Sequence, residues 1–414
     1  MRRLLAPLRR PVPALIALLV AAQALFCWRL TTPHKLVFDE IHYVTAARTL
    51  MALEGPVNIE HPLLGKTLIA AGMLMFGDNP LGWRAMSTLA GTAIVGGVFA
   101  IVWLMTRRTR AAVVGGLLTL VNFMVLVQAR IAMLDGFMAG FVVLAVAALG
   151  WAMRGNASQS RWRWTLGAVL LGLGMGVKWA AVPYLGYAAI GFVVMKHGDP
   201  SRWPGLRWWS AWALLGFGAG VAYAATFAPA FFYAREPLTL GGLLPFQLEM
   251  YARQTQVLPP HAYQSSWWSW PIIGRPIWYF YEIADGAQRG IFLLGNPAVM
   301  WGGLVAVAAC LWGWLRRREV RLGFAAALWI GGFAVWAIIP KSLGFYYYYF
   351  LPAIWLSVAI AVAIDRWRAA LRNWDETYLI GAISLFVYFY PILTAGALAG
   401  PGSFARWTWF ADWR

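Results

Sequence analysis

The chain has 414 residues, of which 61% are hydrophobic and 12% are charged, and its formal net charge is +18. A soluble globular domain carries about a quarter charged residues, so this composition excludes a soluble fold and indicates an integral membrane protein. The apolar runs are long and continuous and lack the alternation of membrane strands, which predicts α-helical spans.

Apolar segments suited to crossing a bilayer occur along the whole chain. In order they are 12–30, 84–105, 111–127, 136–153, 164–177, 180–195, 209–228, 291–315, 322–339, 345–364 and 378–396. The pair 164–177 and 180–195 is shorter than the roughly 20 residues usually needed, so one re-entrant element is the alternative. The predicted fold class is an all-α multi-pass membrane protein, with about 11 transmembrane helices in a single domain, 1–414.

Basic residues orient these spans. They form clusters at every second turn between spans, as the positive-inside rule requires, and a merged 164–195 element would break that order. The cytoplasmic clusters would be Arg2, Arg3, Arg9 and Arg10; Arg107, Arg108 and Arg110; Arg154, Arg161 and Arg163; Lys196, Arg202 and Arg207; Arg316, Arg317, Arg318 and Arg321; and Arg366, Arg368 and Arg372. These girdles meet anionic lipid, so the positive charge requires no nucleic-acid partner.

The N-terminal segment also has features of a signal peptide, with a basic start, an apolar core and Ala22-Gln23-Ala24. We expect an uncleaved anchor, because many further spans follow. Cys27 and Cys310 both fall inside predicted spans, which argues against a disulfide framework or a thiolate metal site. We therefore expect no metal and no resident cofactor.

The first outer loop, 31–83, contains the acids Asp39 and Glu40 and, further on, His61 and Lys66. Ionisable groups at a membrane boundary are costly unless they face water or each other, so this loop is the candidate site. Neighbouring side chains on a helix diverge by about 100°, so the two acids cannot share one proton. We therefore expect one working carboxylate and one structural partner. The alternative for Asp39 is a simple N-cap of a helix over 41–50.

Four cations, Arg84, Arg130, Lys178 and Lys341, each lie at the outer end of a different predicted helix. Held at one depth together with Lys66, they would suit an anionic group such as a lipid phosphate. The alternative is that each side chain extends independently to the lipid headgroups.

The second long outer loop, 229–290, contains a stretch in which His261, Tyr263, Ser266 and Trp267 alternate with other polar and aromatic residues. Tryptophan and tyrosine collect at membrane interfaces in any case. Histidine and serine at short spacing among them favour a wall that stacks on a sugar and hydrogen-bonds its hydroxyls. His61 precedes Pro62, which predicts the opening of another amphipathic helix there; alone, His61 would be an interfacial histidine.

The sequence contains no HExxH motif, no phosphate-binding glycine loop and no GxSxG elbow. It also lacks a soluble domain of the kind that binds nucleotide sugars. A sugar donor, if there is one, should therefore be linked to a lipid.

These residues lie in motifs that resemble the protein O-mannosyltransferase family, which is part of the GT-C superfamily of multi-spanning glycosyltransferases. The motifs occur in family order across 38–352. They are Asp39-Glu40-Ile41-His42-Tyr43, His61-Pro62-Leu63-Leu64-Gly65-Lys66, Gly82-Trp83-Arg84-Ala85-Met86-Ser87, Ala129-Arg130-Ile131-Ala132-Met133-Leu134-Asp135, Val177-Lys178-Trp179, His261-Ala262-Tyr263-Gln264-Ser265-Ser266-Trp267, Trp270-Pro271, Leu294-Gly295-Asn296-Pro297, and Phe345-Tyr346-Tyr347 to Leu351-Pro352.

Two departures from the family pattern are visible. The usual HPP reads His61-Pro62-Leu63, with Glu60 where Asp is common, and the loop 229–290 is too short for the β-trefoil insertion of eukaryotic members. The chain therefore resembles the bacterial members, and the resemblance leaves acceptor recognition open.

The resemblance implies a GT-C fold in a bacterial cytoplasmic membrane, with the site facing the periplasm or exterior. It implies inverting transfer of mannose from polyprenyl-phosphate-mannose to Ser or Thr hydroxyls of exported proteins. Asp39 would be the base and Glu40 its partner. Lys66, Arg84, Arg130, Lys178 and Lys341 would hold the donor phosphate, and His61, His261, Tyr263, Ser266 and Trp267 would line the sugar and acceptor pocket. The alternatives are a same-fold transferase of another lipid-linked sugar, such as an aminopentose transferred to a lipid or a hexose to a glycan, and a transporter.

Overall fold

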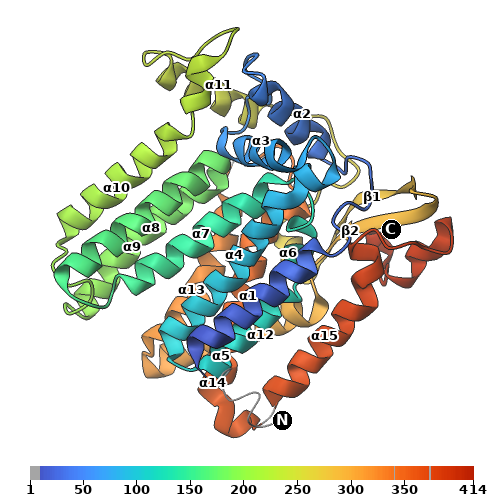
Figure 1. Cartoon of the computed structure of the whole chain (residues 1–414). Helices are drawn as coiled ribbons and strands as arrows, with labels where there is room; N and C mark the ends of the chain where they lie inside the picture. The colour runs from blue at the N-terminus through green and yellow to red at the C-terminus, as the bar shows by residue number, and fades with distance from the viewer. Residues whose placement is uncertain (1–9, 340, 373) are drawn as a thin grey trace.

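The structure is a computed structural model that describes residues 10–339, 341–372 and 374–414. A bundle of long helices with roughly aligned axes makes up most of the molecule (Figure 1). Arg2, Arg3 and Arg9 of the first basic cluster lie outside the described residues, as does Pro340. The helices of the bundle are α1 (Pro11–Cys27), α4 (Pro80–Thr106), α5 (Thr109–Leu120), α6 (Phe123–Gln128), α7 (Leu134–Trp151), α8 (Ala157–Val177), α9 (Val182–Gly198), α10 (Trp208–Ala225), α12 (Pro297–Arg317), α13 (Val320–Ala334), α14 (Phe350–Leu371) and α15 (Trp374–Leu393).

The helical character of the bundle is that expected from the apolar runs. Within the described residues, eight helical stretches are long and apolar enough to cross a membrane. Three expected spans, 12–30, 111–127 and 164–177, correspond to α1, to α5 with α6, and to α8, which are not among those eight. The expected number of spans therefore stays a prediction. The stretch 164–195 is not one continuous element: it forms two helices, α8 and α9.

Helix α14 lies at the centre of the core. Every residue from Phe350 to Ala363 is buried, because the neighbouring helices α4, α5, α12 and α13 pack around it. By contrast, α9 buries only Tyr184 and Phe192. A helix that is apolar on all sides needs apolar neighbours on all sides, and α14 obtains them from protein.

A β-hairpin that the sequence analysis did not anticipate interrupts the long outer loop. Strands β1 (Ile277–Ala284) and β2 (Ala287–Leu293) pair antiparallel around Asp285 and Gly286, both of which have positive φ. Asp-Gly between runs of aromatic and β-branched residues is a strong hairpin signal, so the local sequence held this information. The expected span 291–315 was therefore wrong at its start: β2 runs to Leu293, and α12 begins only at Pro297.

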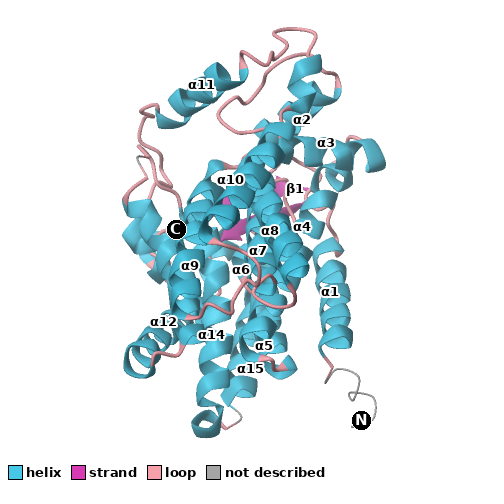
Figure 2. Cartoon of the chain, turned by 90° about the vertical axis from the view of Figure 1, so that its left-hand side faces the viewer, coloured by secondary structure: helices cyan, strands magenta, loops and turns pink. Residues whose placement is uncertain are grey.

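Three amphipathic helices lie at one end of the bundle: α2 (Glu40–Met51), α3 (Leu64–Phe76) and α11 (Leu243–Thr255). Figure 2 shows α11, α2 and α3 above the long helices, with the N-terminal end of the described chain at the opposite end. The helices in the first outer loop are confirmed. The second of them begins at Leu64, however, three residues after the predicted opening at His61.

The start of α4 fixes the depth of Arg84 below these helices. Asn79 caps the helix, because its Oδ1 accepts from the backbone N–H groups of Leu81 at 2.9 Å and Gly82 at 3.3 Å. Pro80 occupies the first turn, where its missing N–H is not needed. Arg84 follows one turn later and faces the first outer loop.

Candidate active site

Glu40 is a fully buried carboxylate that holds three segments of the chain together. Its Oε1 accepts from Arg84 Nε at 2.9 Å and from the backbone N–H of Ala132 at 2.8 Å. Its Oε2 accepts from Arg84 Nη2 at 2.9 Å and from the backbone N–H of Val37 at 2.8 Å. A carboxylate with four good donors is fixed in place. Glu40 is therefore the structural partner of the two acids.

Arg84 uses all five of its N–H groups inside the protein. Beyond the two bonds to Glu40, it donates to the carbonyl oxygens of Leu30, Pro33 and Lys35 at 3.2, 2.9 and 2.8 Å. An arginine offers five donors in a fixed plane, and here none remains for a ligand. The expected contact of Arg84 with a donor phosphate finds no support in this geometry. Arg84 instead anchors the loop that leads to Asp39.

Arg130 caps the C-terminal end of α1. Its Nη1 donates to the carbonyl oxygens of Phe26 and Trp28 at 2.9 and 2.6 Å, and its Nη2 donates to that of Arg29 at 3.1 Å. A cation at this end satisfies the free carbonyls and complements the helix dipole. The side chain is almost entirely buried, and these contacts give Arg130 a structural role at this end of α1, while its expected role in holding a phosphate stays a prediction.

Asp39 differs from its neighbour. It occupies the N-cap position of α2, but its side chain makes no capping hydrogen bond, which removes the cap-only interpretation. Asp39 is half-buried, and among the described residues nothing donates a hydrogen bond to its carboxylate. Burial raises the pKa of Asp39 to about 6, and the nearby charges of Lys178, His42 and His261 act in the opposite direction. A carboxylate with this pKa is suited to accept a proton near neutral pH.

The backbone directly before Asp39 is held in an unusual conformation. Phe38 has a φ of +50°, a region that a bulky non-glycine residue rarely adopts. Its ring stacks on Tyr279 with centroids 4.2 Å apart and meets Tyr347 edge-on at 6.2 Å. Backbone strain of this kind persists where the surroundings over-determine it, commonly at functional sites. Packing of Phe38 thus sets the direction of Asp39.

Lys178 and Asp135 form a buried ion pair next to Asp39. Lys178 follows the last residue of α8 and donates to both carboxylate oxygens of Asp135, each at 2.9 Å. Its ammonium also lies 5.1 Å from the ring of Tyr347 and 5.3 Å from that of Tyr348. In the sequence, Asp135 appeared only as the last residue of one family motif, Ala129–Asp135. The structure makes it the partner that orients Lys178.

Lys66 ties the loop of His61 to helix α3. It is buried and donates to the carbonyl oxygens of Asn58 at 2.6 Å, His61 at 2.8 Å and Val57 at 3.3 Å. Burial lowers the pKa of Lys66 to about 7, and Glu60 opposes that effect. All three donors are used, so Lys66 shapes the site and has no N–H left for a phosphate.

His61 faces this region with an unsatisfied ring nitrogen. Its Nδ1 is buried and has no hydrogen-bond partner within the described part of the chain. Burial lowers the pKa of His61 well below its ordinary value, and the charges of Lys178, Lys66 and Lys341 lower it further. The imidazole is therefore neutral at pH 7. A buried polar atom without a partner is free to hydrogen-bond a ligand or a water molecule.

Lys341 has N–H donors that no described residue uses. Its ammonium makes one hydrogen bond within the described residues, at 3.0 Å to the carbonyl oxygen of Gln254. Burial lowers the pKa of Lys341 to about 8, with Lys178 adding to the shift and Glu60 opposing it. Gln254 also donates to the carbonyl oxygen of Glu60 at 2.7 Å. Helix α11 thereby connects Lys341 with the first outer loop.

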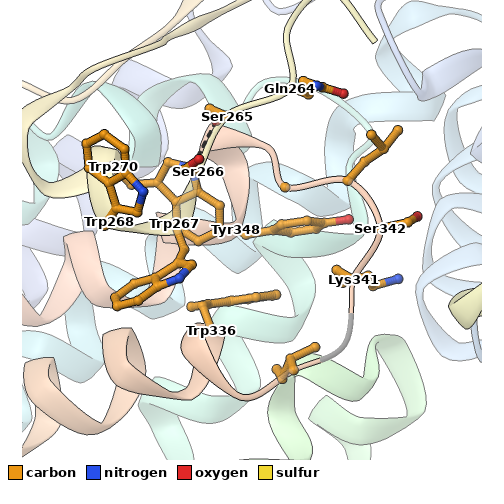
Figure 3. Close-up of a pocket in the computed structure, with 13 residues that line it drawn as sticks. Gln264, Ser265, Ser266, Trp267, Trp268, Trp270, Trp336, Lys341, Ser342 and Tyr348 are labelled. Carbon is orange, nitrogen blue, oxygen red and sulfur yellow. Dashed lines mark hydrogen bonds between the residues drawn. The ribbon is translucent and has the colours of Figure 1, made fainter. Parts of the chain in front are cut away.

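A cavity of about 450 Å³ opens beside Lys341 (Figure 3). The indole of Trp336 and the phenol ring of Tyr348 stack face to face in it, with centroids 4.7 Å apart. The other lining residues are Gln264, Ser265, Ser266, Trp267, Trp268, Trp270, Ile339, Ser342, Leu343 and Gly344. Asp39 does not line this cavity. It is linked to it through Lys178, which lies against the ring of Tyr348.

The expected sugar and acceptor residues divide between two positions. Ser266 and Trp267 line the cavity. His261 and Tyr263 precede it, where Nδ1 of His261 accepts from the backbone N–H of Tyr263 at 3.1 Å. Trp336 and Tyr348 were not among the sugar and acceptor residues expected from the sequence. Tyr348 lies in a run of four tyrosines, and interfacial aromatics are so common in membrane proteins that this signal could not be separated from them.

Within the described residues, His, Cys, Asp and Glu form no group of three or more that could hold an ion.

Comparison with known proteins adds family and fold to this geometry. Residues 74–231 match the family described as dolichyl-phosphate-mannose-protein mannosyltransferase, and residues 239–413 match the C-terminal four-TMM region of protein-O-mannosyltransferase. The chain is 26% identical to the polyprenol-phosphate-mannose–protein mannosyltransferase of Mycolicibacterium smegmatis, over 91% of this chain and 87% of that one. It is 24% identical to the protein of that name from Corynebacterium glutamicum, over 91% and 88%.

Solved structures agree on the fold. The S. cerevisiae protein O-mannosyltransferase complex bound to the sugar donor matches with a TM-score of 0.82 at 12% identity, covering 97% of this chain and 92% of that one. ArnT from Cupriavidus metallidurans bound to undecaprenyl phosphate matches less well, with a TM-score of 0.59 at 17% identity, over 91% and 70%. At these identities the likeness concerns the fold alone.

Proposed function

The chain belongs to the protein O-mannosyltransferase family of GT-C glycosyltransferases, and from that premise we propose that it transfers mannose from a polyprenyl-phosphate-mannose donor to Ser or Thr hydroxyls of exported proteins. The observation that carries the site assignment is the contrast between two adjacent acids. Glu40 has four hydrogen-bond donors, whereas the carboxylate of Asp39 is open and its pKa is raised to about 6.

Asp39 activates the acceptor. A serine or threonine hydroxyl is a weak nucleophile near neutral pH, so a base has to take its proton as the new bond forms. The hydroxyl oxygen bonds to the anomeric carbon, the bond from that carbon to the phosphate oxygen breaks, and the proton passes to Asp39. Attack on the face opposite the leaving group inverts the anomeric centre.

Lys341 binds the departing phosphate. Polyprenyl phosphate leaves as a stable anion and needs no general acid, but charge builds on the bridging oxygen and cations stabilise it. Lys341 has unused N–H groups and lines the cavity. Lys178 contributes positive charge from its position beside Asp135 and Tyr348. Of the five cations expected from the sequence, the proposal assigns these two to the donor phosphate.

The aromatic cavity accommodates the sugar or the acceptor. Trp267, Trp336 and Tyr348 provide flat apolar faces, and Ser266 provides a hydroxyl at its rim. Sugars present C–H faces that pack against aromatic rings, together with hydroxyls that need hydrogen-bonding partners. His61 does not line this cavity, but its unpartnered Nδ1 offers a polar contact in the first outer loop.

The active end of the bundle faces away from the cytoplasm in this proposal. Hydrogen bonds at that end join the first outer loop to the segment 128–135, that segment to Lys178, and the first outer loop to Gln254. Such contacts are expected if all these residues are on one side of the membrane. The arginine-rich turns lie at the other end, which the positive-inside rule places in the cytoplasm. In a bacterium this orientation puts Asp39 at the periplasmic or exterior face of the cytoplasmic membrane.

A single comparison tests the assignment. Membranes containing the wild type, Asp39→Asn or Glu54→Gln are incubated with polyprenyl-phosphate-mannose and a Ser/Thr-rich peptide, and the peptide mass is measured. Glu54→Gln makes the same carboxylate-to-amide change at an exposed position of the same loop. We expect a hexose on the peptide with wild type and Glu54→Gln, and a loss of about 10²-fold or more with Asp39→Asn. Full activity of Asp39→Asn would exclude this base.

The same assay separates the remaining choices. A mass increment other than a hexose would indicate a different lipid-linked sugar. Absence of peptide modification together with a sugar on lipid would favour a lipid acceptor. A parallel incubation with a chelator measures any metal requirement directly.

A further inference from the structure

A second cavity lies at the end of the bundle opposite Asp39. It measures about 380 Å³ and is formed where α5 begins, α14 ends and α15 begins. Figure 1 shows α14 and α15 reaching this end, while α2 and α3 lie at the other. Its lining residues are Arg108, Arg110, Ala111, Val114, Ala361, Ile364, Asp365, Arg368, Ala369, Arg372 and Asp375. None of them has a part in the proposed reaction.

The rim of this cavity carries a surplus of positive charge. Four arginines and two aspartates line it, which leaves two uncompensated positive charges. Asp375 is taken by Arg110, whose Nε and Nη2 donate to its carboxylate at 2.6 and 2.8 Å. Asp365 is shared by Arg108 at 3.4 Å and by Arg321 from α13 at 3.3 Å. Both aspartate side chains are nearly buried, so neither is open to a further cation.

Arg368 and Arg372 have no such partner. Within the described part of the chain, neither side chain makes a hydrogen bond or an ion pair with a protein group, and both are exposed at the rim. Guanidinium groups bind phosphate oxygens with two parallel hydrogen bonds. Two open guanidinium groups at the mouth of one cavity therefore suit a phosphate.

The floor of the cavity is apolar. Ala111 and Val114 come from α5, and Ala361 and Ile364 from α14. Inorganic phosphate would leave this floor and most of the volume empty. A phosphate that carries an apolar chain would fill both parts, because its headgroup meets the arginines while its chain follows the helices into the bilayer. Basic pockets between membrane helices on the cytoplasmic side bind lipid headgroups in this way.

From these features we propose that the cavity between α5, α14 and α15 binds the phosphate headgroup of an anionic phospholipid of the leaflet opposite the active site. Arg368 and Arg372 hold the phosphate. Arg110 is kept in place by Asp375, and Val114, Ala361 and Ile364 contact the start of an acyl chain. The proposal stands apart from the transferase reaction and uses none of its residues.

The test measures lipid binding to the purified full-length protein by native mass spectrometry. Phosphatidylglycerol is the probe, with phosphatidylcholine and inorganic phosphate as comparisons. The variant is Arg368→Gln with Arg372→Gln. The control is Arg316→Gln with Arg317→Gln, which removes the same charge from two exposed arginines at the end of α12 that do not line the cavity. Thermal unfolding checks that each variant is folded. If a double variant does not fold, one of its two single substitutions is tested in its place.

We expect phosphatidylglycerol to bind the wild type and the control with the same affinity. Its affinity for the cavity variant should be lower by about ten-fold or more. Phosphatidylcholine should bind poorly to all three. Equal weakening in the control would show that general basic charge attracts the lipid, and would overturn the proposal. Displacement of phosphatidylglycerol by millimolar inorganic phosphate would overturn it as well, since it would assign the cavity to free phosphate. Mannosyl transfer by the cavity variant should stay near that of the wild type.

Discussion

Two groups of charged residues lie side by side at the end of the bundle that carries α2 and α3, and they differ in one respect. Around Glu40, every strong donor and acceptor has a partner: Arg84 uses five N–H groups and Glu40 accepts four hydrogen bonds. Around Asp39, groups are left over. They are the carboxylate of Asp39, Nδ1 of His61 and the free N–H groups of Lys341.

This difference separates scaffold from chemistry. A saturated ion pair is rigid and cannot bind or react without breaking, so its value is in holding the loop that carries Asp39. A partly buried polar group without a hydrogen-bond partner is unfavourable in the free protein. A bound substrate can supply the missing partner. The following experiments treat the two groups separately, beginning with the largest expected effect.

The scaffold is tested by Glu40→Ala. The change leaves Arg84 buried without its counter-ion, and breaking a buried pair typically costs about 3–5 kcal/mol of stability. We expect a large fall in the unfolding temperature in detergent. Asp39→Asn should leave that temperature unchanged. Equal unfolding temperatures for Glu40→Ala and the wild type would contradict the scaffold role.

The reactive group is tested by Lys341→Met. Removing one donor from the developing negative charge should lower kcat by about 10²–10³-fold, with little change in stability because only one carbonyl contact is lost. Lys66→Met is the matched control. It should destabilise the protein, because the carbonyl oxygens of Asn58 and His61 lose their donor. A fall in kcat for Lys66→Met without any loss of stability would show that Lys66 acts in the reaction and not only in holding the loop.

The pH dependence of kcat/KM tests both titrating groups together. Asp39 must be deprotonated to act as base, so activity should fall about ten-fold per unit as pH drops below about 6. Lys341 must be protonated, so activity should fall again above about 8. In Lys341→Arg the fall in kcat/KM at alkaline pH should shift to higher pH, since arginine stays charged. An alkaline limb unchanged in that variant would assign it to another group.

The smallest effect is expected for Arg130→Gln. This change weakens the cap on the C-terminal carbonyls of α1, and such helix-end interactions are worth about 0.3–2 kcal/mol. The unfolding temperature should fall slightly while kcat and KM stay near the wild-type values. A rise in KM for the donor without a change in stability would instead return Arg130 to the phosphate.

Local sequence was sufficient for much of the architecture. Hydropathy along single segments predicted the helical class, the places of most long helices, and the amphipathic helices of the first outer loop. It did so because burial of one helix in lipid depends on its own residues. The Asp285-Gly286 hairpin was equally local. It was missed because residues 277–290 were assigned to the long outer loop and only the end of β2, 291–293, to the start of a span.

The sequence also predicted which types of residue gather at the end of the bundle that carries α2 and α3, and that one of two adjacent acids would be structural. Only the tertiary structure decided which of the five cations stay available. Arg84 is 44 residues from Glu40 in the chain, and Ala132 is 92 residues from it. Whether a charged group is saturated depends on carbonyl and N–H groups brought from such distances by packing. No single segment of the chain contains that information.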